Sequence, residues 1–212
     1  GHRFVGKSVP DQWKLTNTAD YGIGYSHSFG MIDINAQLLN GDGYAADGNE
    51  TNDLAHYLRV LYGESNIIKN DGFNIGIVAT DTKLDLDIDD DKDDGKDHDK
   101  QIDKSNSTSL VGVFAGCSAN NYRFGMEHNS FGNGANNTTV TAYYINYNTG
   151  KWNFFARHDM MEIEDLSNSD KSLSYICAIW NPVNGLYISP NIIMNDTEDI
   201  GDEMRLTFMF KY

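Results

Sequence analysis

The sequence predicts an all-β fold in which antiparallel strands run up and down in chain order and close into a barrel. Three observations predict it. Apolar and polar residues alternate with a period of two in segment after segment. The connections between these segments alternate in length, so that the long ones share one end of the sheet. Aromatic residues make up 12% of the chain and there are only three prolines, a composition that favours extended structure.

About twelve segments have the alternation and the length of strands. We predict strands at about 2–9, 19–29, 31–40, 54–63, 73–84, 107–116, 122–131, 138–147, 152–162, 172–181, 186–194 and 203–212. Apolar rows run from Tyr21 to Phe29, from Ile32 to Leu38 and from Phe73 to Ala79. The clearest row ends the chain, where every second residue from Met204 to Tyr212 is apolar. Each strand is therefore predicted to have one apolar and one polar face.

The connections indicate how these strands are arranged. Every odd-numbered connection is longer than its neighbours, apart from a medium-length turn at 64–72. In an up-and-down sheet the odd connections share one rim and the even connections the other. A soluble β-sandwich is the alternative, but its crossings would scatter the long loops between both ends. We therefore predict one barrel domain over residues 1–212, with an acidic external loop at 85–106.

Charge and hydropathy exclude two classes of protein. The chain has 31 acidic and 16 basic side chains, a formal net charge of −15, which excludes nucleic-acid binding through a basic surface. No apolar run approaches the roughly 18 to 20 residues of a membrane-spanning helix. A membrane-spanning β-strand needs only about 10 residues with alternate ones apolar, so a transmembrane barrel fits the pattern.

The last strand carries a family resemblance. The ending MRLTFMFKY resembles the C-terminal strand of Gram-negative outer-membrane proteins, and WKLTNTADYGIGYSHSFG and IDINAQLLNGDGY are similar to segments of porin-like proteins. The resemblance implies a bacterial outer-membrane location and a last strand that is read by the barrel-assembly machinery. It also implies long loops outside the cell and a barrel wall in contact with membrane lipid. The acidic loop is then expected to bridge to neighbouring lipopolysaccharide through divalent ions. Such porins have about sixteen or more strands, so a twelve-stranded barrel and the C-terminal part of a larger one both stay open.

If the apolar rows face lipid, the alternate rows line the interior. Eight charged residues are then predicted to line a pore: Asp33, Arg59, Arg123, Glu127, Arg157, Asp159, Glu203 and Arg205. Arginine does not lose its charge on burial, so this interior is expected to hold water. The function expected is passive diffusion of ions or small polar solutes, without enzymatic activity or a required cofactor. The alternative is that these charges only brace the wall.

Aromatic residues near the strand ends would form belts at the two membrane interfaces. The candidates are Tyr44, Tyr62, Tyr122, Phe131, Tyr147, Trp152, Trp180 and Tyr187.

The acidic segment from Asp81 to Lys104 holds eleven aspartates and five lysines. An EF-hand alignment on Gly95 fails, because it places Lys92 and Gln101 at ligand positions. A solvated external loop is expected, with weak Ca²⁺ or Mg²⁺ binding as the remaining metal prediction. Its ligands would be Asp87, Asp89, Asp91 and Asp93.

Two alternative functions stay open, as does a homo-oligomeric state. His128 and Ser130 lie two apart on one predicted strand face, which is similar to the His-x-Ser of the outer-membrane phospholipase family and suits lipid-ester hydrolysis. Folding the hairpin about Gly134 places Val140 opposite His128, so the group that should orient the histidine is absent. The other alternative is a non-conducting structural or adhesion barrel whose acidic loops bind cations.

Overall fold

The computed structural model describes residues 8–13, 21–40, 54–83, 107–132, 137–164, 170–196 and 201–211. They form one antiparallel sheet of eleven strands, in which neighbours in the chain are neighbours in the sheet. The strands are β1 (Gly22–Phe29), β2 (Ile32–Leu39), β3 (Ala55–Gly63), β4 (Gly72–Lys83), β5 (Ser107–Ala119), β6 (Tyr122–Gly132), β7 (Asn137–Thr149), β8 (Trp152–Ile163), β9 (Lys171–Val183), β10 (Leu186–Asn195) and β11 (Glu203–Phe210). This confirms the predicted up-and-down antiparallel fold.

The first predicted strand, 2–9, is wrong where the structure describes it. Val9 begins helix α1 (Val9–Gln12), and residues 1–7 lie outside the described part of the chain. The Gln12 N–H donates to the Ser8 carbonyl at 2.7 Å and the Trp13 N–H to the Val9 carbonyl at 3.2 Å. Pro10 fits this first turn, where its missing N–H is not needed. The described sheet therefore has one strand fewer than predicted.

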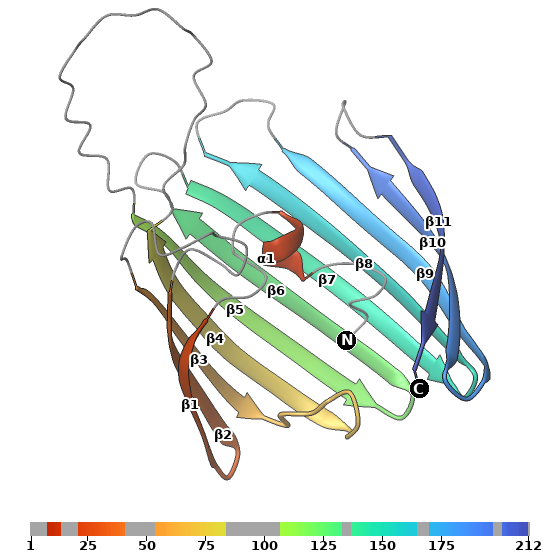
Figure 1. The fold of residues 1–212 in the computed structure, drawn as a ribbon, viewed down its shortest axis with the longest axis horizontal. Coiled ribbons are helices and arrows are strands. Elements are labelled where there is room, and N and C mark those ends of the chain that lie inside the picture. Colours follow the sequence, from red (N-terminus) through yellow and green to blue (C-terminus); the bar gives the residue numbers. More distant parts are fainter. Residues whose placement is uncertain are drawn as a thin grey trace, which may run out of the picture.

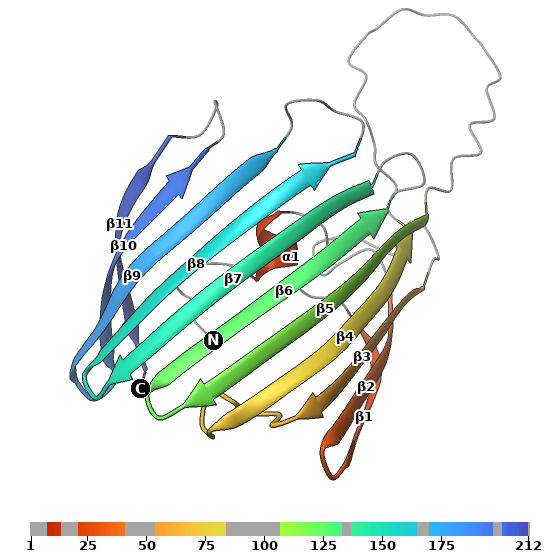
Figure 2. The same cartoon turned by 180° about the vertical axis from the view of Figure 1, so that it is seen from behind.

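The sheet is strongly curved, and α1 lies on its concave side (Figures 1 and 2). At one rim, tight turns join β1 to β2, β5 to β6, β7 to β8 and β9 to β10. Gly30 and Gly150, with φ of 66° and 60°, allow two of these turns, since such φ angles cost glycine little. This rim, called the short-turn rim below, is the one predicted from connection lengths.

The two faces of the sheet differ as the alternation predicts. Large apolar side chains on the convex face are exposed, including Ile23 at 74%, Ile75 at 56% and Leu206 at 59%. The residues between them point to the concave face, where Leu61 and Asp159 are fully buried. Directly paired residues share a face of the sheet. The strand register therefore places the apolar rows of all eleven strands on the convex face and the alternate rows on the concave face.

The core lies on the concave face, beneath α1. Val9 packs with a buried cluster of Leu110, Val140, Ala142 and Met161. Trp13 contacts this cluster and also a second one, formed by Leu173, Tyr175 and Ile193. The N-terminal segment is thus seated on β5 to β10 by apolar contact.

Gly125 makes room for an aromatic ring on the concave face. A Cβ added at Gly125 would stand 2.1 Å from Cζ of Tyr144, its opposite residue on β7. We expect Gly125→Ala to lower the free energy of unfolding by about 1 to 3 kcal/mol, the usual cost of overpacking. Urea unfolding in detergent would measure it.

The matched control is Gly125→Ala in a Tyr144→Ala background. There the added methyl has no ring to meet, and the cost should fall below about 1 kcal/mol. An equal cost in both backgrounds would contradict the steric explanation.

Candidate functional site

All eight charged residues predicted to line a pore lie on strands β2, β3, β6, β8 and β11 and point to the concave face. They do not form one group. Arg157 and Asp159 form a buried pair, and Glu203 and Arg205 an exposed one on β11. Glu127 lies two strands from Asp159, with Ala142 between them. The remaining three, Asp33, Arg59 and Arg123, lie elsewhere on the wall.

The buried pair joins the wall to the N-terminal segment. Arg157 Nη2 donates to Asp159 Oδ2 at 2.8 Å, with side-chain exposures of 9% and 0%. The indole Nε1 of Trp13 donates to the same oxygen at 3.3 Å. The Arg157 guanidinium also lies over the ring of Tyr175, 4.7 Å from its centroid. A carboxylate taken from water needs such partners, so Asp159 holds both the arginine and the tryptophan.

Sequence reasoning missed this contact, because Trp13 lay in a predicted connection. The sequence signal that could have indicated the contact is the pair of apolar residues, Val9 and Trp13, in an otherwise polar segment. A large apolar side chain in a polar loop is informative when it has a surface to cover. Here that surface is the interior wall.

Arg123 braces the wall at the short-turn rim. Its Nε donates to the Ile67 carbonyl at 3.0 Å, its Nη2 to the Ile68 carbonyl and its Nη1 to Asn146 Oδ1 at 2.9 Å. Asp71 also fixes this connection, by accepting from the Asn120 N–H at 3.0 Å. The connection between β3 and β4 is therefore held against the concave side of β5 to β7. The sequence did not predict this role for Arg123, since the connection at 64–72 stood out only as an exception to the alternation of long and short connections.

The convex face has an aromatic belt at the short-turn rim. Ring centroids lie 6.2 Å apart for Tyr62 and Phe73, 4.5 Å for Tyr122 and Tyr147, and 5.7 Å for Trp152 and Trp180. Two belt predictions are wrong: Phe131 and Tyr187 pack against buried clusters on the concave side. Alternation explains both, because each lies one residue out of phase with the convex row. Tyr44 lies outside the described residues.

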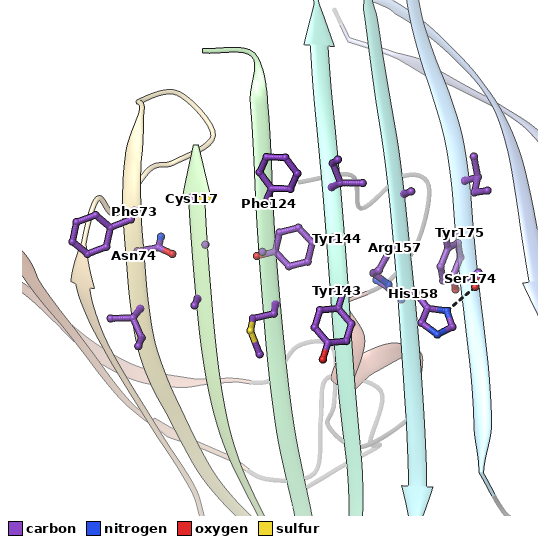
Figure 3. Close-up of a pocket in the computed structure, with 18 of the residues that line it drawn as sticks. Phe73, Asn74, Cys117, Phe124, Tyr143, Tyr144, Arg157, His158, Ser174 and Tyr175 are labelled. Carbon is purple, nitrogen blue, oxygen red and sulfur yellow. Dashed lines mark hydrogen bonds between the residues drawn. The ribbon is translucent and has the colours of Figure 1, made fainter. Parts of the chain in front are cut away.

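His128 has a partner that the sequence reasoning placed wrongly. Thr141 lies opposite it, not Val140, and His128 Nδ1 and Thr141 Oγ1 are 2.8 Å apart. A second pair of this kind, His158 Nδ1 and Ser174 Oγ, is also 2.8 Å apart and borders a shallow convex-side hollow in Figure 3. Within the described part of the chain, no hydrogen bond joins His128 to Ser130.

No group of three or more acidic, histidine or cysteine side chains that could hold a metal ion occurs among the described residues. The predicted calcium or magnesium ligands Asp87, Asp89, Asp91 and Asp93 lie outside them. In the described ranges, no helix is both long enough and apolar enough to cross a membrane.

Comparison with known proteins identifies the fold. No family model matches the chain, and a search of curated proteins found no match either. Among solved structures, the chain is similar to a porin refined at 1.8 Å resolution, with a TM-score of 0.65 and 12% sequence identity. The match covers 95% of this chain and 64% of the porin, so the chain spans less than two thirds of that porin's length. The chain thus has an antiparallel sheet that is similar in fold to the wall of a porin barrel.

Proposed function

We propose that the chain forms the wall of a porin-like channel in the bacterial outer membrane, through which ions or small polar solutes diffuse passively. One observation carries the proposal. The sheet has two different faces. The convex face has exposed apolar side chains with an aromatic belt at one rim, and the concave face has both acidic and basic side chains. Lipid suits the first face and water the second.

Diffusion through such a channel needs no chemical step. The eight charged side chains predicted to line the pore, four acidic and four basic, are spread over the concave wall, and their field would orient polar solutes. Segment 8–13, anchored through Val9 and Trp13, takes up part of the concave side and would narrow the passage. The connection held by Arg123 would do the same near the short-turn rim.

The proposal requires a closed barrel. Among the described strands, β1 and β11 each pair on one side only, and hydrocarbon cannot satisfy the backbone groups of a free edge. These edges must pair with each other or with further strands. Proposed partners are membrane lipid, lipopolysaccharide reached through divalent ions at the acidic loop, and assembly machinery that reads β11.

Conductance across a planar bilayer in asymmetric salt tests the proposal. We expect discrete current steps after insertion, and the reversal potential would report the ion preference. A protein that folds and inserts without steps would contradict the channel and favour the structural or adhesion barrel.

The membrane orientation gives a separate prediction. Ile77 is 50% exposed on the convex face of β4, and Ile77→Arg should lower the free energy of unfolding in lipid vesicles by about 2 to 4 kcal/mol. Thr80→Arg, on the concave face of the same strand, is the control and should change it by less than about 1 kcal/mol. Urea titration followed by gel mobility measures both, and equal effects would contradict the assignment of faces.

A lipid hydrolase is the second candidate, favoured by the contact between His128 and Thr141. This contact supplies a group that orients a histidine beside a serine on the convex face. Hydrolysis of phospholipid by the purified protein, lost in Ser130→Ala, would support it. No hydrolysis by the folded protein would remove it.

A further inference from the structure

The concave side of β1 to β3 contains a polar recess of about 520 Å³. Its lining includes Ser26, Ser28, Asp33, Asn35, Tyr57 and Arg59. It lies away from the apolar clusters that seat α1, which are formed by β5 to β10. Every one of these six side chains can make a hydrogen bond, so the recess suits a small polar solute.

The two charges of this recess do not form an ion pair with each other. Arg59 lies opposite Asn35, and Asp33 lies two residues further along β2. Neither Asp33 nor Arg59 takes part in an ion pair with another described residue. Arg157 and Asp159, and also Glu203 and Arg205, are by contrast paired. The recess therefore offers a separate positive and a separate negative group.

Packing holds the Arg59 guanidinium in place. It lies over the ring of Phe114, 5.1 Å from the centroid. That ring reaches across β4 because Gly76 leaves room for it: a Cβ there would stand 2.3 Å from Phe114 Cζ. Stacking on a ring face leaves the N–H edge of a guanidinium free to bind a carboxylate. Arg59 is thus arranged to bind an anion.

A hydrogen-bonded ladder holds the neighbouring amides. Gln37 Nε2 donates to Asn35 Oδ1 at 2.7 Å, and Asn35 Nδ2 donates to Ser26 Oγ at 2.5 Å. Held side chains lose less entropy when a ligand binds. The ladder lies beside Asp33 and Arg59 on the same face.

We propose that this recess binds small zwitterionic solutes of the α-amino acid type, with the ligand carboxylate on Arg59 and its ammonium group on Asp33. The inference rests on the proposed channel and names a class of solute for it. A neutral polyol would leave both charges without a counterpart, and a simple cation or anion would satisfy only one.

Equilibrium binding of glycine to the protein purified in detergent, followed by calorimetry, tests the proposal. Glycine should bind at least about tenfold more tightly than acetate or methylammonium, because each of these lacks one charge-assisted contact. Arg59→Gln and Asp33→Asn should each weaken glycine binding by at least about tenfold. Lys151→Gln and Asp170→Asn remove exposed charges outside the recess and should leave binding unchanged.

Equal binding of glycine, acetate and glycerol by the unmodified protein would overturn the proposal, as would unchanged glycine binding in the two recess variants. The ligand series needs no variant, so it decides the matter even if Arg59→Gln does not fold. Conductance is measured separately. A protein that conducts without binding glycine contradicts only this inference, and one that binds glycine without conducting contradicts only the channel.

Discussion

Replacing Asp159 by asparagine is expected to lower the free energy of unfolding by about 3 to 5 kcal/mol, because it leaves the buried Arg157 without its carboxylate. Both side chains are almost fully buried, so water cannot take the place of the lost partner. The substitution keeps the shape of the side chain and removes only its charge. Urea unfolding of the protein in detergent, followed by gel mobility, would measure the change.

Two further variants separate this effect from simple charge loss. Asp170→Asn removes an exposed carboxylate and should change stability by less than about 0.5 kcal/mol. The double variant Arg157→Met with Asp159→Leu should recover most of the loss, because well-packed apolar residues often replace a buried ion pair at little cost. An Asp159→Asn variant as stable as the unmodified protein would contradict a stabilising ion pair between Arg157 and Asp159.

Replacing Trp13 by alanine is expected to raise the mean single-channel conductance and to make it fluctuate. The change removes the half-buried indole and its hydrogen bond to Asp159. A loss of about 2 kcal/mol of packing would shift the balance between seated and released segment about thirtyfold. Planar-bilayer recordings would report this as a larger and noisier open level.

Trp152→Phe is the control for this recording. Trp152 belongs to the convex belt, so its replacement should leave the open level unchanged. Traces of Trp13→Ala that superpose on those of the unmodified protein would show that the segment does not limit the passage.

The strands from residue 19 onward could be predicted because period-two alternation records which face is buried. Segments β4 to β10 begin and end close to the predicted residues. Helix α1 could not be predicted, since a four-residue helix is too short to show a periodicity. The residues that it packs against also come from strands that are distant in sequence.

The predicted pairing of His128 with Val140 is wrong, and the alternation itself excludes it. Val140 belongs to the concave row and His128 to the convex row, and directly paired residues must share a face. The connection between β6 and β7 has an even number of residues, so its centre falls between two of them. Requiring the faces to agree would have selected Thr141.

The candidate site was predictable in position but not in pairing. Alternation places Arg123, Arg157 and Arg59 on one face, yet one binds backbone carbonyls, one a buried carboxylate and one an aromatic ring. Asp159 is two residues from Arg157 on the same face of β8, so alternation places that pair side by side. The partners of Arg123 and Arg59 come from a turn and a strand that are distant in sequence, and the sequence period carries no information on them.

The chain has three tryptophans, and the fold divides them between the two faces of the sheet. Trp13 lies on the concave side, whereas Trp152 and Trp180 are about two-fifths exposed on the convex side. Brominated acyl chains should therefore quench the fluorescence of Trp152 and Trp180 and spare Trp13, while a water-soluble quencher small enough to pass should do the reverse. Intrinsic emission would then tell, without any label, which surface of the sheet is wet.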